Sequence, residues 1–249
     1  MSLIGGGLGV AVLNWASRNG AVERCDIATA YIGRSKLEVL LGADIWNQVR
    51  GKDVLDYGCG PGHEVVEIAE HGARHVVGID LRPRWLELGE AHAHERGVSD
   101  RCTFARGWTD PVDLIISLDS FEHFADPGSV LTGMRALLRP GGRVLAAFGP
   151  TWYHPLGGHV YSVFPFSHLL FSENALVRWR ALHKTDGART IEESGLNKMT
   201  IKRFIDLVEA SPLRFAHFEL LPIRPLRRLA NRLTREFTTA AVRCSLVPR

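Results

Sequence analysis

Cysteine is scarce in this sequence. Of its 249 residues only Cys25, Cys59, Cys102 and Cys244 are cysteines. No two of them form a C-x-x-C pair, which excludes the usual zinc-finger ligand pair and the redox dithiol. Scattered thiols are typical of a reducing compartment, so we expect a cytoplasmic protein.

Long hydrophobic runs are also missing. The most apolar stretch near the start, residues 1–15, contains four glycines and lacks the basic residues that open a signal peptide. It is also shorter than the roughly 20 residues that a helix needs to cross a bilayer. We interpret it as a helix-forming arm, and we predict no transmembrane segment.

Charge is small in total but uneven. The net charge is +3, yet residues 200–249 contain ten Lys or Arg against four Asp or Glu. A basic tail can contact an anionic substrate, a membrane surface or nucleic acid, or it can form a solvated helix face. Neither a zinc finger nor an RNA-binding aromatic signature is present, so we expect no nucleic-acid partner.

Residues 52–150 alternate between strand and helix patterns. Such alternation with short links predicts a parallel sheet with helices on both faces, and ligands of these sheets bind beyond the carboxyl ends of the strands. The predicted strands are 53–56, 75–80, 102–106, 112–118 and 143–148, and the predicted helices are 62–70, 83–96 and 128–138.

The two ends of the chain follow other patterns. We expect the first 45 residues to be helical and to pack over one end of the sheet. Residues 150–199 are rich in histidine, proline and aromatics. Beyond them we predict a helix at 200–210 and strands at 213–221 and 237–246. Between these strands we predict a helix at 226–235, with Arg224, Arg228, Arg232 and Arg235 along one face.

The most informative stretch is VLDYGCGPG, residues 54–62. A strand, a glycine turn and a helix present backbone N–H groups and the positive helix end to a ligand. The dinucleotide fingerprint is G-x-G-x-x-G, whereas this turn is G-x-G-x-G and follows Asp56. A carboxylate there suits a cationic amine better than a phosphate. Asp80, at the end of the second strand, is placed to accept hydrogen bonds from ribose hydroxyls.

VLDYGCGPG, VVGID, DLIISLDSFEHFADP and LLRPGG together resemble class I S-adenosylmethionine-dependent methyltransferases, in the small-molecule (methyltransferase type 11/12-like) branch. The resemblance covers residues 52–150. It implies an α/β, Rossmann-like, doubly wound and mostly parallel sheet of seven strands with the last strand antiparallel. It also implies S-adenosylmethionine as cofactor and S-adenosylhomocysteine as product.

The resemblance implies a role for each part of the cofactor site. The glycine turn would face the methionine part, Asp56 the amino group and Asp80 the ribose. Leu81 and Trp108 would flank the adenine, although GWTD departs from relatives that carry an acidic residue after the glycine. The implied cofactor-binding residues are Asp56, Gly58, Cys59, Gly60, Gly62, Asp80, Leu81, Gly107, Trp108, Asp119 and Ser120, the last two beside the sulfonium.

Two histidines are candidates for catalysis. Methyl transfer to an alcohol gains from a base, and histidine is the usual one near neutral pH. His123 follows the fourth strand in SFEH, and His159 lies in HPLGGH, after the fifth strand. His123 can instead lock the following helix, and His159 can instead contact the acceptor.

Other features of residues 150–199 and of the arm leave alternatives open. The spacings of His154, His159, His168 and Glu173 match no standard metal motif, so we predict no metal site. The aromatics Trp152, Tyr153, Tyr161, Phe164 and Phe166 can form a core of their own or an acceptor pocket. Tyr31 and Arg34 can close over the cofactor as a lid.

We therefore predict one methyltransferase domain. Within it, residues 1–50 form a helical arm or lid, 51–150 the cofactor-binding core and 151–199 an acceptor-site insertion, and 200–249 complete the sheet. The predicted reaction is methyl transfer to a hydroxyl of a small molecule, of the sugar or glycan type or the phenolic type. The alternatives are a nicotinamide-dependent oxidoreductase, a non-catalytic S-adenosylmethionine-binding protein and an RNA methyltransferase that uses the basic tail. The oligomeric state has no signature in the sequence.

Overall fold

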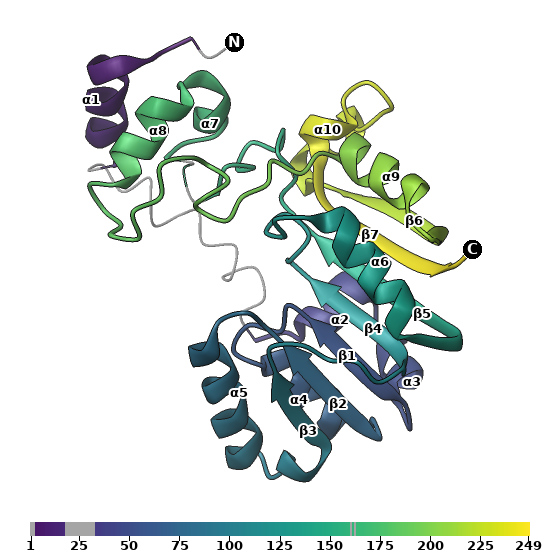
Figure 1. The fold of residues 1–249 in the computed structure, drawn as a ribbon. Helices are drawn as coiled ribbons and strands as arrows, with labels where there is room; N and C mark the ends of the chain where they lie inside the picture. Colours follow the sequence, from purple (N-terminus) through teal and green to yellow (C-terminus); the bar gives the residue numbers. More distant parts are fainter. Residues whose placement is uncertain (1–2, 18–32, 160, 162) are drawn as a thin grey trace.

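A seven-stranded sheet forms the centre of the protein (Figure 1). The computed structural model describes residues 3–17, 33–159, 161 and 163–249. The strands are β1 (Asp53–Tyr57), β2 (His75–Ile79), β3 (Cys102–Ala105), β4 (Val112–Leu118), β5 (Leu138–Phe148), β6 (Leu213–Pro222) and β7 (Thr239–Pro248). Their order is β3-β2-β1-β4-β5-β7-β6. β1 to β5 are parallel, and β7 is antiparallel to both β5 and β6. The predicted doubly wound sheet with an antiparallel last strand is confirmed.

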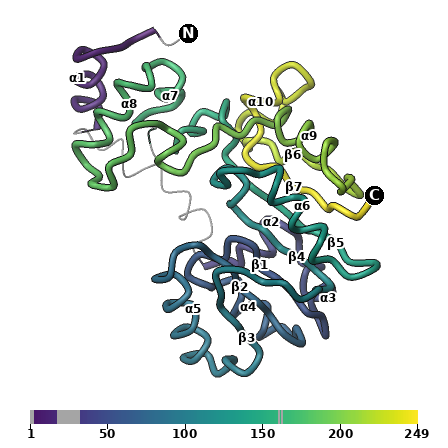
Figure 2. The backbone as a smooth tube through the Cα atoms, in the orientation of Figure 1, coloured from purple at the N-terminus to yellow at the C-terminus, as the bar shows by residue number. Residues whose placement is uncertain are grey.

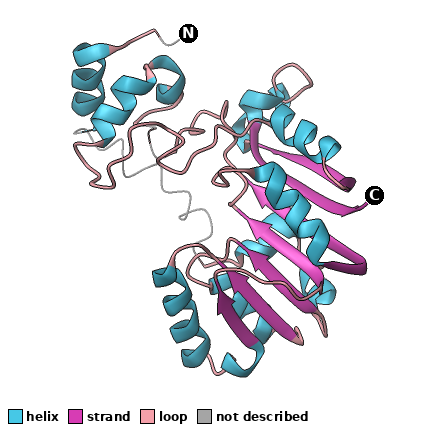
Figure 3. Ribbon diagram, in the orientation of Figure 1, coloured by secondary structure: helices cyan, strands magenta, loops and turns pink. Residues whose placement is uncertain are grey.

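Helices cover both faces of the sheet, as Figure 3 shows. Side chains alternate along each strand, so neighbours such as Val54 and Leu55 enter different cores. One core joins the sheet to α2 (Lys36–Leu41), α3 (Ile45–Val49), α4 (His63–Glu70) and α5 (Pro83–Glu95). The other joins it to α6 (Pro127–Leu137) and α9 (Ile201–Ala210).

A third core lies away from the sheet. It is built by α1 (Gly6–Ala16), α7 (Ser167–Leu170), α8 (Glu173–Arg180) and the loops around them. Leu13 of α1 packs with Phe171 and Trp179, and Gly9 allows close approach because a Cβ there would lie 3.0 Å from that of Ala175. Figure 2 shows the first helix beside this later segment. The prediction that the first 45 residues pack over the sheet therefore holds for α2 and is wrong for α1, and residues 18–32 lie outside the described residues.

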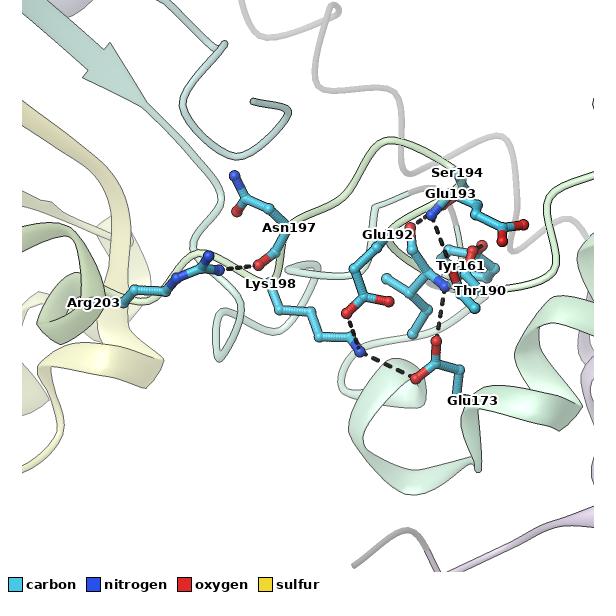
Figure 4. A network of polar contacts seen from close by, with 10 residues as sticks. Tyr161, Glu173, Thr190, Glu192, Glu193, Ser194, Asn197, Lys198 and Arg203 are labelled. Carbon is cyan, nitrogen blue, oxygen red and sulfur yellow. Dashed lines mark hydrogen bonds and ion pairs between the residues drawn. The ribbon is translucent and has the colours of Figure 1, made fainter. Parts of the chain in front are cut away.

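Polar contacts hold the loops around this third core in place (Figure 4). The carboxylate of Glu173 accepts from the backbone N–H of Ile191 at 2.9 Å and from Lys198 Nζ at 3.1 Å. Lys198 also pairs with Glu192 at 2.6 Å. The long segment after α8 is thus held to the start of that helix.

The predicted arginine-rich helix at 226–235 is wrong. The segment forms a 3-10 helix, η5 (Arg224–Leu229), and a short α10 (Arg235–Thr238). Asn231 interrupts the helix because its side-chain oxygen accepts from the backbone N–H of Leu233 at 2.8 Å and of Thr234 at 3.2 Å. The arginines therefore do not share one helix face. No helix within the described ranges is both long and apolar enough to cross a bilayer.

Candidate active site

The carboxyl ends of β1, β2 and β4 meet at one edge of the sheet. Since β1 pairs in parallel with both β2 and β4, the loops that follow these three strands are neighbours. The backbone N–H of Gly60 donates to Asp80 Oδ2 at 3.2 Å, and Ser120 Oγ donates to the Gly58 carbonyl at 3.4 Å. The structure therefore brings together three of the segments predicted to hold the cofactor.

The three glycines of the turn have different physical reasons to be glycine. All have positive φ, at 89° for Gly58, 51° for Gly60 and 77° for Gly62. A Cβ on Gly58 would lie 2.6 Å from Ser120 Oγ, and one on Gly62 would lie 2.5 Å from a ring carbon of Phe104. A Cβ on Gly60 would meet nothing within 4 Å. Packing thus explains Gly58 and Gly62, whereas Gly60 faces open space, where a ligand can approach the backbone.

Lys36 joins this edge from α2, although no motif in the sequence indicates it. Its Nζ lies 3.1 Å from Asp119 Oδ2 and 3.8 Å from Glu64 Oε1. Burial alone would lower the pKa of Lys36, but the carboxylates of Asp119 and Glu64 raise it. The pKa of Asp119 is raised by burial, against the influence of Lys36. Lys36 is therefore paired with two carboxylates from different loops of this edge.

Asp56 lies buried beneath this group. Burial and the nearby charge of Glu64 raise its pKa to about 8, while Lys36 acts in the opposite direction. A carboxyl group in this state ionises readily when another cation arrives. It can therefore respond to the amino group of the predicted cofactor.

Asp80 follows the carboxyl end of β2. Asp80 Oδ1 accepts from the backbone N–H of Arg82 at 2.9 Å, so the carboxylate already ties two loops together. Leu81 is 77% exposed beside it, and Gly107 is also exposed.

Cys59 of the glycine turn is buried, and burial raises the pKa of its thiol. The residue is therefore a packing group and not a nucleophile.

Trp108 lies elsewhere. Its ring centroid is 6.3 Å from that of His75, the first residue of β2, and the side chain packs against the second sheet core. The carboxyl end of β2 is four residues further along the strand. The structure therefore does not bring Trp108 to the edge where the other predicted cofactor residues meet.

His123 and His159 come together although they are far apart in the sequence. Their rings meet edge to face with centroids 5.2 Å apart. His123 Nδ1 lies 2.6 Å from the Gly195 carbonyl, which can only accept, so Nδ1 carries the hydrogen and Nε2 keeps a lone pair. Desolvation by the surrounding protein lowers the pKa of His123 from its ordinary 6.5, although the hydrogen bond to the Gly195 carbonyl acts in the opposite direction. Burial lowers the pKa of His159 to about 4, and its Nδ1 is buried without a partner among the described residues.

Asn197 fastens the loop that carries His123, and sequence reasoning missed it. Its Nδ2 donates to the carbonyls of Phe121 at 2.7 Å and Phe124 at 2.8 Å, and its backbone N–H donates to that of Glu122 at 2.9 Å. Phe121 is fully buried against other aromatic rings. The segment at 195–197 and the loop after β4 are thus clamped to each other.

The remaining polar candidates of the insertion are used by its own structure. His154 Nδ1 accepts from the backbone N–H of Leu156 at 2.9 Å, and His168 Nε2 donates to the Trp152 carbonyl at 2.7 Å. Glu173 binds Ile191 and Lys198, as Figure 4 shows. Among the described residues, no three His, Cys, Asp or Glu side chains gather as metal ligands would.

The aromatic residues of the insertion divide into two groups. Trp152, Tyr161 and Phe164 pack in the third core, as the plainer of the two interpretations predicts. Tyr153 and Phe166 instead contact the ring of Phe237, with centroid distances of 5.5 and 6.5 Å. Of the proposed lid residues, Arg34 is exposed and Tyr31 lies outside the described residues.

The glycines provide a matched test of the turn. Gly60→Ala should lower the free energy of unfolding by about 1 kcal/mol, the cost of a left-handed alanine, and should strongly weaken binding of S-adenosylmethionine. Gly62→Ala should destabilise by at least about 2 kcal/mol, because the clash with Phe104 adds to that cost. Urea denaturation and calorimetric titration measure the two effects. Wild-type affinity in Gly60→Ala would contradict the assignment of this turn to the ligand.

Asp56 should release its proton when the cofactor binds. Below about pH 8 it is protonated in the unliganded protein, and a cationic ligand favours the ionised form. Affinity for S-adenosylmethionine should therefore rise as the pH approaches 8 from below. Near neutral pH, titrations in two buffers of different ionisation enthalpy should report release of up to about one proton. Asp56→Asn should abolish the release, and an unchanged release in this variant would assign the proton to another group.

Comparison with known proteins supports the assignment of this chain to the methyltransferases. The sequence model of the methyltransferase domain family matches residues 32–197, well over half of the chain. A ubiquinone biosynthesis O-methyltransferase of Aeromonas salmonicida is 40% identical over 100 residues, which cover 38% of this chain and 42% of that protein. An uncharacterised methyltransferase of Mycobacteroides abscessus is 35% identical over 134 residues, covering 49% of this chain and 50% of that protein. The matches thus span about half the length of these relatives or less.

Solved structures show the same fold. A crystal structure of an S-adenosylmethionine-dependent methyltransferase from Mesorhizobium loti superposes with a TM-score of 0.53 at 22% identity, covering 81% of this chain and 93% of that one. Magnesium protoporphyrin IX methyltransferase of Synechocystis, solved with bound SAH, gives 0.52 at 17% identity and covers 93% and 84%. The expected methyltransferase family is confirmed by the sequence model, and the expected fold by the solved structures. The chain belongs to the methyltransferase domain family.

Proposed function

We propose that the protein transfers the methyl group of S-adenosylmethionine to a hydroxyl oxygen of a small-molecule acceptor, with His123 as general base. The observation that carries the proposal is the 2.6 Å hydrogen bond from His123 Nδ1 to the Gly195 carbonyl. It leaves the Nε2 lone pair to accept a proton, and it holds the ring in one orientation.

The cofactor, when bound, supplies a methyl group on a cationic sulfur. Asp56 would take its amino group, Asp80 the ribose, and the backbone of Gly58 to Gly60 the methionine part. Leu81 and Gly107 are exposed where the adenine would lie. Asp119 and Ser120 follow β4 and would lie beside the sulfur. His123, three residues further on, would receive the hydroxyl proton as the oxygen attacks the methyl carbon in line.

One observation favours an oxygen acceptor, and a second favours a phenolic hydroxyl over a sugar hydroxyl. The curated relatives in the comparison include proteins named O-methyltransferases. The pKa of His123 lies below the ordinary value of 6.5, so its neutral form is a weak base. Proton transfer to a weak base is easier from a phenol, whose pKa is about 10 as in tyrosine, than from a sugar hydroxyl, which is far less acidic.

The acceptor would lie between the loop after β4 and the insertion at 151–199. His159 would contact the acceptor there, since its ring touches that of His123 and its Nδ1 has no partner among the described residues. With a pKa of about 4 it stays neutral at physiological pH, which suits a hydrogen-bonding role toward the acceptor. The free thiols at Cys59, Cys102 and Cys244 suit the reducing cytoplasm.

His123→Asn tests the base. Asparagine places an amide N–H near the Gly195 carbonyl and removes the Nε2 lone pair. We expect kcat/KM to fall by about 10² to 10⁴, the usual contribution of a general base, with unchanged affinity for S-adenosylmethionine. With S-adenosylmethionine saturating, so that protonation of Asp56 does not limit cofactor binding, kcat/KM for the acceptor in the wild type should fall at acid pH as His123 is protonated. The midpoint should lie below 6.5, and the variant should lose this limb. The assay is methyl transfer to a panel of phenols, sugars and amines.

His159→Asn is the matched control. Because His159 is assigned to binding, its loss should raise KM for the acceptor more than it lowers kcat. Transfer to amines alone would contradict an oxygen acceptor, and a full acidic limb in His123→Asn would contradict the base. If every acceptor fails while the cofactor binds, a non-catalytic binding protein becomes the better description.

A further inference from the structure

The loop between β6 and β7 carries positive charge that nothing in the described part of the chain neutralises. It spans residues 223–238, and we call residues 224–235 the basic tip. None of its arginines forms an ion pair within the described residues. The one acidic residue of the loop, Glu236, accepts from the backbone N–H groups of Ile201 and Lys202 at 3.0 Å each. The arginines are Arg224, Arg227, Arg228, Arg232 and Arg235.

Two leucines project from the same tip. Leu233 is 91% exposed and Leu229 is 60% exposed. Their backbone is held firmly, since Asn231 Oδ1 accepts from the Leu233 N–H at 2.8 Å and Thr234 Oγ1 donates to the Leu229 carbonyl at 2.5 Å. The turn therefore presents large apolar side chains to solvent from a fixed position, among arginines.

The basic tip lies at the active-site edge of the sheet. β6 and β5 are both antiparallel to β7, so the end of β6 points the same way as the ends of β1 to β5. Figure 1 shows the loop beside α10 at this end of the sheet. Next to the tip, the ring of Phe237 contacts the rings of Tyr153 and Phe166, so the loop also touches the insertion.

We propose that the basic tip docks the protein on an anionic lipid bilayer, with the active-site edge toward the membrane. Arginines attract anionic headgroups, and exposed leucines gain free energy by entering the boundary between headgroups and acyl chains. Nucleic acid would use the arginines alone, since its phosphates offer nothing to a leucine that is 91% exposed. The proposal does not depend on the methyl acceptor.

Flotation of the full chain with lipid vesicles tests the proposal. The protein should float with phosphatidylcholine vesicles that contain phosphatidylglycerol and not with phosphatidylcholine alone, and added salt should weaken the binding. Arg227→Ala with Arg228→Ala should lower the partition coefficient about 30-fold, and Leu233→Ser about tenfold.

The matched control is Arg50→Ala with Arg214→Ala. These arginines are exposed, form no ion pair among the described residues and lie at the opposite edge of the sheet, before β1 and near the start of β6. The control should float like the wild type. Absence of flotation, equal loss in the control, or an unaffected Leu233→Ser variant would overturn the proposal. Binding of a nucleic-acid duplex that needs the arginines and not Leu233 would also overturn it. Vesicle binding is measured without turnover, so the result is independent of whether methyl transfer is found.

Discussion

The parallel pairing of β1 with β2 on one side and β4 on the other is the constraint on which the rest of the site depends. It makes neighbours of three loops that are far apart in the sequence. The hydrogen bond between Gly60 and Asp80 and the contact between Gly58 and Ser120 follow from it. A shift of β1 by one residue would turn Val54 and Leu55 toward the wrong cores, so the two apolar layers protect the register that the site needs.

The proposed acceptor side would depend on a second feature, the hydrogen bonds from Asn197 to the loop after β4. It connects the insertion, which has its own core, to the sheet that carries the glycine turn. His123 is thus oriented from two directions, by β4 before it and by the carbonyl of Gly195 across from it. Electrostatics adds a further condition, because Lys36 already pairs with Asp119 where a cationic cofactor is expected to bind. In the proposed site the cofactor and Lys36 would therefore share the carboxylate of Asp119.

The sheet and most of its helices could be predicted from the sequence because apolar runs, glycine stops and helix caps are local signals. The strand at 112–118 and the helix start at Thr200, whose side chain accepts from the Arg203 N–H, are examples. The contributions of Lys36 and Asn197 could not, since they arise from contacts between distant segments. Trp108 was misplaced because the loop after β3 runs back along the sheet to His75. The spacing of the arginines predicted a helix, but the Asn231 side chain binds the backbone N–H groups of Leu233 and Thr234. Such local side-chain hydrogen bonds compete with the helix, and the periodicity of the sequence does not reveal them.

The proposed site requires that the turn at Gly58 to Gly62 bind S-adenosylmethionine through its backbone and the neighbouring carboxylates. Calorimetric titration of the purified protein with S-adenosylmethionine, with S-adenosylhomocysteine and with NADH tests it most directly. We expect binding in the micromolar range for the first two ligands, which share the amino group and the adenosine, and no heat for NADH. Binding of NADH alone would rule this out, because a pyrophosphate would then occupy an edge that carries the carboxylates of Asp80 and Asp119.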